Sequence, residues 1–193
     1  MTRSINRRTF LSTAAATGAT LTAPSVLRAA TGEPFELMDH LKPREVKIAR
    51  KHKFEPGQIV VTLQAFYLYH MQDERTAIRY GVAVGKEGLN FRGDASIDRK
   101  VEWPNWTPTQ EMIERNPGYA RWEDGMPGGP NNPLGSRALY LYQNGKDTLF
   151  RIHGTNVPGS IGTPSSNGCI RMYNPHVEHL YTVLPIGTKV TVF

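Results

Sequence analysis

The stretch between His153 and Cys169 constrains the fold of this chain more than any other segment. Glycines and prolines recur within it, at Gly154, Pro158, Gly159, Gly162, Pro164 and Gly168. This composition favours an ordered, non-helical loop with several backbone positions open to positive φ. Such a loop can fold its two ends together. We therefore expect a histidine and the only cysteine of the chain to lie close in space.

This pairing points to nucleophilic chemistry. A thiol is a strong nucleophile only as the thiolate, and a neighbouring imidazole is the commonest group that generates one near neutral pH. Gly168, directly before Cys169, would let the backbone approach a substrate carbonyl, with nearby amides directed at a developing oxyanion. The alternative is that Cys169 is a small buried hydrophobic residue, because free cysteine is among the most buried residue types.

The sequence from residue 58 onward is typical of β-structure. Apolar residues alternate with others between Ala77 and Val84, a period of two that predicts one strand with a buried and a wetter face. A polar turn at residues 72–74 predicts a hairpin. Further strands are expected at residues 59–63, 65–71, 138–142, 149–153 and 188–193. If His153 ends a strand, the sheet holds it rigidly.

Two helices are predicted. The first has Thr107 as N-cap, Pro108 at its first position, Gln110 as the reciprocal capping residue, and Pro117 as its stop. The second begins at residues 174–175 and packs on the sheet. Its apolar stripe comprises Val177, Leu180, Tyr181 and Leu184.

Residues 87–137 form a stretch rich in Gly, Pro and Asn that is too long for a plain connection in a compact domain. We expect it to border a cleft. Its three tryptophans, Trp103, Trp106 and Trp122, can pack in a small core of the insertion or stack on sugar rings.

The first 30 residues predict a twin-arginine export signal. Arg7 and Arg8 precede an apolar, Ala/Thr-rich stretch that ends in small residues near residue 30. An uncleaved membrane anchor is the alternative, but Gly18 and Pro24 interrupt the apolar run, which is shorter than the ~20 residues that span a bilayer. We expect export to the periplasm or cell envelope. A single cysteine forms no intramolecular disulfide there, so a lone exported thiol favours a catalytic role.

Residues 31–56 contain closely spaced charged side chains, which predict a solvated lead-in or a surface helix. One domain is expected to follow at residues 57–193. The formal net charge of +6 includes four arginines within the first 30 residues, which hold no acidic residue, so the remainder carries 6 − 4 = +2. This small excess gives no basis for nucleic-acid binding.

His-Gly-Thr at residues 153–155, followed by Ser-Asn-Gly-Cys-Ile-Arg-Met at residues 166–172, resembles the active-site signature of the L,D-transpeptidase (YkuD-type) catalytic domain. The similarity extends to Asn-Pro-Leu-Gly at 132–135 and to residues 80–85, and covers roughly residues 56–193. It implies a mainly β fold, a YkuD-type β-sandwich or partly closed sheet with one or two short helices. It also implies action on peptidoglycan stem peptides without a cofactor.

The resemblance assigns roles by position. Cys169 would be the nucleophile, His153 the general base, and the Gly154 carbonyl the group that orients the imidazole. The substrate and oxyanion contacts would involve Gly168, Ser166, Asn167 and Arg171, the last through a carboxylate of the stem peptide. Many family members carry histidine at the position of Asn167, where this chain has an amide that can donate and accept hydrogen bonds.

Several functions stay open at this stage. The acyl acceptor can be an amine, giving a transpeptidase, or water, giving an L,D-carboxypeptidase. A non-catalytic cell-wall-binding module would keep the fold and use the loop for recognition. A metal site built from His153, Cys169, His176 and His179 matches no common zinc spacing, and the last two fall on the flank of the second helix away from its apolar stripe, where we expect them to be solvated.

Overall fold

The structure is a computed structural model that describes residues 35–193, which form one compact unit. The predicted export signal at residues 1–30 lies outside the described residues. Among residues 35–193, no helix is long and apolar enough to cross a membrane.

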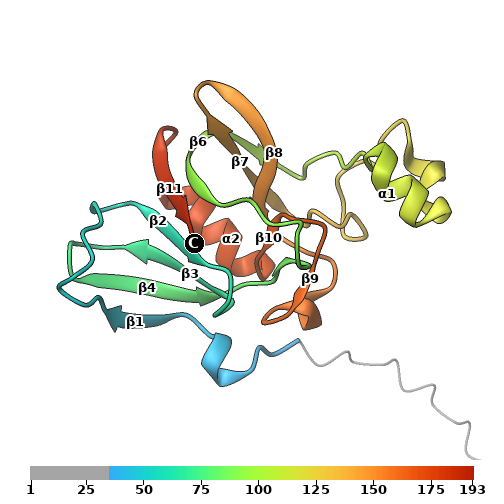
Figure 1. Ribbon diagram of the computed structural model, residues 1–193. Coiled ribbons are helices and arrows are strands. Elements are labelled where there is room, and N and C mark those ends of the chain that lie inside the picture. Colours follow the sequence, from blue (N-terminus) through green and yellow to red (C-terminus); the bar gives the residue numbers. More distant parts are fainter. Residues whose placement is uncertain (1–34) are drawn as a thin grey trace, which may run out of the picture. The chain divides into compact units, whose positions relative to one another are not determined.

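A nine-stranded mixed sheet forms most of the molecule (Figure 1). The strand order is β1-β4-β3-β2-β11-β6-β7-β8-β10. The strands are β1 (Arg44–Lys47), β2 (Ile59–Thr62), β3 (Tyr67–Met71), β4 (Thr76–Gly81), β6 (Gly93–Glu102), β7 (Arg137–Gln143), β8 (Lys146–His153), β10 (Ile170–Arg171) and β11 (Thr188–Val192). The prediction of a mainly β fold is therefore confirmed.

One hydrophobic core lies between the two halves of this curved sheet and a helix. Buried residues of β2, β3 and β4 share it with buried residues of β6, β7, β8 and β11. Helix α2 (Asn174–Val183) contributes Val177 and Leu180, and Leu184 follows at its end; all three are at most 1% exposed. The predicted apolar stripe is confirmed at these positions, whereas Tyr181 is only partly buried against the core.

The segment predicted as one strand at residues 77–84 divides into two. β4 ends at Gly81, and β5 (Val84–Gly85) pairs instead with β9 (Pro164–Ser166) in a separate two-stranded sheet. The expected wetter face is also wrong, because Ala77 and Ala83 are fully buried and Gly81 packs closely on Leu41. The chain thus leaves the main sheet to support the loop that precedes Cys169.

The charged segment before residue 57 was expected to be a solvated lead-in or a surface helix. Most of its described residues are exposed, as expected of a lead-in, but the segment contains a strand and a short 3-10 helix rather than a surface α-helix. A short 3-10 helix, η2 (Asp39–Leu41), leads into β1, which pairs antiparallel with β4 at the edge of the sheet. Leu37 and Leu41 are buried in a cluster with Ala83 and Ile161. A few apolar residues between the charges are enough to anchor the segment.

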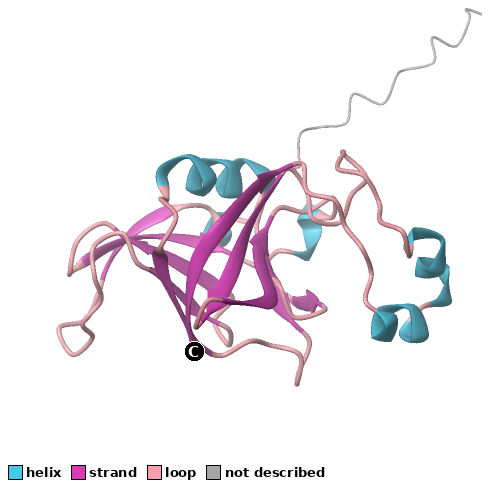
Figure 2. Ribbon diagram, turned by 90° about the horizontal axis from the view of Figure 1, so that it is seen from above, coloured by secondary structure: helices cyan, strands magenta, loops and turns pink. Residues whose placement is uncertain are grey.

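The insertion between β5 and β7 carries β6, α1 (Gln110–Arg115) and the 3-10 helix η3 (Pro117–Trp122). Sequence patterns missed β6, which pairs with both β11 and β7. The cap of α1 is Thr109, whose side chain accepts from the Met112 amide, so the expected start at Thr107 is wrong by about half a turn. Figure 2 shows the helices of the insertion set apart from the strands.

Candidate active site

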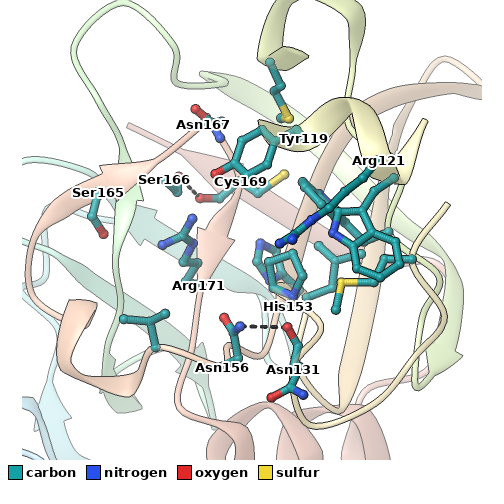
Figure 3. A pocket seen from close by; sticks show the side chains of 17 residues that line it. Tyr119, Arg121, Asn131, His153, Asn156, Ser165, Ser166, Asn167, Cys169 and Arg171 are labelled. Atoms are coloured by element: carbon teal, nitrogen blue, oxygen red, sulfur yellow. Dashed lines mark hydrogen bonds between the residues drawn. The ribbon is translucent and has the colours of Figure 1, made fainter. Parts of the chain in front are cut away.

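A pocket of about 790 Å³ opens between the insertion and the ends of β8 and β10. Cys169, His153, Arg171 and Tyr119 line this pocket (Figure 3). Trp106 of the insertion lines it as well. The long insertion therefore borders the cleft, as the sequence predicts.

Strand pairing explains how the two ends of the Gly-rich loop meet. β8 ends at His153, and β10 runs parallel to it with Arg171 opposite His153. The Met172 amide donates a hydrogen bond to the His153 carbonyl at 2.8 Å, which continues the pairing beyond the strand. The two ends of the loop thus lie side by side, as expected, and His153 ends a strand of the main sheet.

His153 is 3% exposed, and its Nδ1 lies 2.6 Å from the Gly154 carbonyl oxygen. Because a carbonyl only accepts hydrogen bonds, the contact with Gly154 favours the neutral tautomer that carries its proton on Nδ1. Burial, followed by the positive charge of Arg171, lowers the pKa of His153 to about 3. The imidazole is therefore neutral at pH 7 and can accept a proton at Nε2. The Gly154 carbonyl occupies the orienting position expected from the sequence.

Cys169 is half-buried, and its Sγ lies 3.9 Å from the Leu149 carbonyl oxygen. Burial raises the pKa of the thiol, while the Arg151 amide and the charges of Arg151 and Arg171 oppose this rise. Within residues 35–193 the thiol makes no hydrogen bond to His153. The two side chains share the pocket in Figure 3. A proton transfer from this thiol to the imidazole would require the sulfur to leave the Leu149 carbonyl.

The residues before Cys169 form a tight turn. Ser166 is buried; its hydroxyl donates to the Cys169 carbonyl and accepts from the Gly168 amide at 3.1 Å. Gly168 has a φ of +122°, and a Cβ there would lie 2.6 Å from the Leu89 carbonyl oxygen. The Gly168 amide was expected in the oxyanion hole, but it is engaged with Ser166. The Cys169 amide has no hydrogen-bond acceptor in the described part of the chain.

Arg171 supplies positive charge to the pocket. Its guanidinium forms no ion pair with any described acidic residue, and its Nε is buried without a hydrogen-bond partner. Burial lowers the pKa of Arg171, although an arginine remains charged. Asn167 is exposed at the pocket rim, beside half-buried Ser165. Carboxylate binding by Arg171 stays a prediction.

The three tryptophans of the insertion lie in different environments, and stacking on sugar rings stays a prediction. Trp106 packs edge-on against Tyr119 with ring centroids 5.2 Å apart, and its backbone pairs with Met126. Trp106 and Trp122 both line the pocket, whereas Trp103 is 48% exposed elsewhere. Tyr119 also lines it, and sequence reasoning missed this residue because nothing in a Gly- and Pro-rich stretch fixes which aromatic faces inward.

The remaining histidines do not join the site. His176 is half-buried between Tyr80 and Tyr173, with ring centroids 5.5 and 5.3 Å away, so the expectation that it is solvated is wrong. Burial lowers the pKa of His176 to about 4. His179 is exposed on the same helix. Among the described residues, no group of three or more His, Cys, Asp or Glu is arranged to hold a metal ion.

Known proteins are similar to this chain in sequence. Residues 56–192 match the family described as YkuD, the L,D-transpeptidase catalytic domain. A protein from Fuscovulum blasticum, named a putative L,D-transpeptidase in the ATP synthase subunits region, is 32% identical over the full length of both chains. Several longer curated relatives are also similar, and the chain spans 43% of their length.

Solved structures show the same fold. A Brucella melitensis protein titled a probable carnitine operon oxidoreductase is 51% identical, with a TM-score of 0.54 over 79% of this chain and 93% of its own. An L,D-transpeptidase from Enterococcus faecium is 18% identical, with a TM-score of 0.54 over 72% of this chain and 50% of its own. The family match and the full-length relative confirm the resemblance read from the motif: this chain belongs to the YkuD family of L,D-transpeptidase catalytic domains.

Proposed function

We propose that this protein is a cysteine acyltransferase that acts on the stem peptides of peptidoglycan. The observation that carries the proposal is the pairing of β8 with β10, which brings Cys169 and His153 to one pocket with Nδ1 of the imidazole bound to the Gly154 carbonyl. This is the arrangement of nucleophile, base and orienting group that activates a thiol.

In the first step, Sγ of Cys169 attacks the carbonyl carbon of the third residue of a stem tetrapeptide. The thiol proton passes to Nε2 of His153 as the S–C bond forms. The C–N bond to the terminal D-amino acid then breaks, and His153 returns the proton to the leaving amine. The products of this step are a thioester on Cys169 and a free D-amino acid.

In the second step, an acceptor attacks the thioester and the thiol is regenerated. An amine of another stem gives a cross-link, and a free D-amino acid gives an exchange. Water gives the carboxypeptidase alternative. In each case His153 takes a proton from the acceptor and returns one to sulfur. The acceptor therefore decides the product without changing the catalytic pair.

The pKa directions define the resting state. The pKa of His153 is lowered to about 3 and the pKa of the Cys169 thiol is raised, so the proton stays on sulfur in the empty pocket. Attack on the substrate must then accompany proton transfer, because a separate thiolate and imidazolium are disfavoured in a buried site. Arg171 opposes the rise in the thiol pKa and offers its guanidinium to a substrate carboxylate.

Mass spectrometry of the products of a purified disaccharide-tetrapeptide tests the proposal. The native chain should release the terminal D-amino acid and give cross-linked, exchanged or hydrolysed product. Cys169→Ala should abolish all three, and His153→Ala should reduce them strongly. Turnover that survives in Cys169→Ala would contradict the acyl-enzyme. Wall binding by the native chain without any turnover would favour the non-catalytic binding module.

The place of action is a further part of this proposal. Arg7 and Arg8 with the following apolar stretch support export by the twin-arginine route to the periplasm or cell envelope. Replacing both arginines by lysine should leave the protein in the cytoplasmic fraction of cells that produce it. An unchanged distribution between fractions would contradict this route.

A further inference from the structure

We propose that Asn174 is a positioning residue for catalysis, which holds the peptide group that orients His153. The inference rests on the proposed function, in which His153 is the base. Asn174 is the first residue of α2 and lies five positions after Cys169. None of the sequence patterns above singled it out, because an asparagine before a proline at a helix start has an ordinary capping explanation.

The Asn174 side chain is not used for capping. The N-cap of α2 is Tyr173, which makes no side-chain hydrogen bond to the helix. The Asn174 side-chain oxygen instead accepts from the Thr155 amide at 2.9 Å and, more weakly, from the Ser136 amide at 3.4 Å. It therefore joins the segment after His153 to the segment before β7.

Two glycines make room for this oxygen. A Cβ on Gly154 would lie 2.1 Å from Oδ1 of Asn174, and a Cβ on Gly135 would lie 2.3 Å from it. Real side chains do not approach so closely, so the backbone closes on this oxygen at two positions where only glycine fits. Because glycines surround Oδ1 of Asn174 at two positions, we infer that the position of this oxygen is important for the structure of the site.

The coupling to His153 passes through a single peptide group. The Gly154 carbonyl, which accepts from Nδ1 of His153 at 2.6 Å, and the Thr155 amide belong to the same planar peptide. The described chain contains no cis peptide bond, so this carbonyl and amide point in opposite directions. Asn174 binds one end of the group and His153 binds the other.

Fixing the amide therefore fixes the carbonyl. The resulting series runs from Nδ1 of His153 to the Gly154 carbonyl, across the peptide to the Thr155 amide, and on to Oδ1 of Asn174. Hydrogen bonds in series polarise one another, so Asn174 also makes the carbonyl a better acceptor. The consequence is that Nδ1 keeps the proton and Nε2 stays available as the base.

The test compares Asn174→Ala, which removes the acceptor, with Asn174→Asp, which keeps it. Thr182→Ala is the matched control, because Thr182 lies on the same helix and is exposed, and its hydroxyl bonds only to the Glu178 carbonyl. We expect kcat/KM to fall about tenfold to a hundredfold in the Ala variant, mainly through kcat, and to recover within about threefold of native in the Asp variant.

A second readout needs no substrate. NMR of ¹⁵N-labelled histidine reports which imidazole nitrogen carries the proton. The native chain and Cys169→Ala should show His153 protonated at Nδ1 alone, and Asn174→Ala should show a mixture of tautomers. This measurement separates the two ideas: an inactive native protein with a fixed tautomer refutes the function but supports the positioning role.

Two results would overturn the inference. One is an unchanged tautomer and an unchanged kcat/KM in Asn174→Ala. The other is an Asp variant as impaired as the Ala variant, because Asp keeps the oxygen that accepts from the Thr155 amide and should therefore restore activity if this hydrogen bond is what matters. Where the Ala variant does not fold, the Asp variant is compared with the native chain instead: an activity within about threefold of native and His153 protonated at Nδ1 alone support the inference, and a mixture of tautomers with a larger loss overturns it.

Discussion

Substituting alanine for Gly168 should destabilise the protein through two separable effects. The φ of +122° is unfavourable for any residue with a Cβ, at a cost of about 1–3 kcal/mol. The new Cβ would also lie 2.6 Å from the Leu89 carbonyl oxygen and 2.8 Å from the Phe150 ring. The ring can move, but the carbonyl belongs to backbone that is held by a hydrogen bond from the Leu89 amide to the Lys86 carbonyl.

Gly57 provides a matched control for this prediction. Its φ of +81° is also positive, but a Cβ there would meet nothing within 4 Å. Gly57→Ala should therefore show the backbone cost alone, about 1 kcal/mol. Gly168→Ala adds the collision, for a total of about 3–4 kcal/mol, or a fall in Tm of roughly 6–16 °C.

Urea and thermal unfolding followed by circular dichroism measure both variants. The difference between them reports the collision at Leu89, since both share the cost of a positive φ. We also expect Gly168→Ala to slow acylation of Cys169 by a carbapenem, because the turn before the nucleophile must shift. Equal destabilisation of the two variants, within about 0.5 kcal/mol, would refute the claim that the turn is tightly packed.

Three further predictions concern other parts of the molecule. Lys100→Met should lower the free energy of unfolding by about 1–3 kcal/mol in urea titrations, because Nζ donates to the Tyr181 and Leu184 carbonyls at 2.6 and 2.8 Å near the end of α2. Lys146→Met, at an exposed site, is the control. Equal effects of the two substitutions would contradict this reasoning. Stability should fall as the pH decreases from about 6.5 to 4, because the pKa of His176 is about 4 in the folded protein and 6.5 otherwise, so the unfolded chain binds more protons in this range. His176→Phe should weaken that dependence, and an unchanged pH profile would count against the burial of this ring. Arg171→Met should raise KM about tenfold to a hundredfold for a stem peptide with free carboxylates and much less for its amidated form, and equal increases for both would exclude carboxylate binding.

The sequence predicted those parts of the fold that local chemistry determines. Period-two alternation located β4, the β-type sequence from residue 58 onward located β2, β3, β7, β8 and β11, and the apolar spacing of Val177, Leu180 and Leu184 located α2. It failed where the partner of a segment decides its structure. β1 is a strand because β4 offers a free edge and Leu41 finds a buried site, and neither fact can be read from a stretch of closely spaced charges.

The candidate site likewise contains some features that local sequence predicts and others that depend on distant segments. Cys169 and His153 stood out because a thiol, an imidazole and a Gly-rich loop are chemically distinctive. The engagement of the Gly168 amide by Ser166, the aromatic wall at Tyr119 and the role of Asn174 depend on hydrogen bonds and packing between distant segments. The close approach of Oδ1 of Asn174 to Gly135 and Gly154 exists only in the folded chain, where the three segments that carry these residues meet.

Trapping the covalent intermediate tests the central claim most directly. The native chain is mixed with disaccharide-tetrapeptide, quenched in acid within milliseconds to seconds, digested and analysed by mass spectrometry. We predict a disaccharide-tripeptide thioester on the peptide that contains Cys169, and His153→Ala should form it at least a hundredfold more slowly. Product that forms without this adduct, or an adduct that forms equally fast in His153→Ala, would contradict the account.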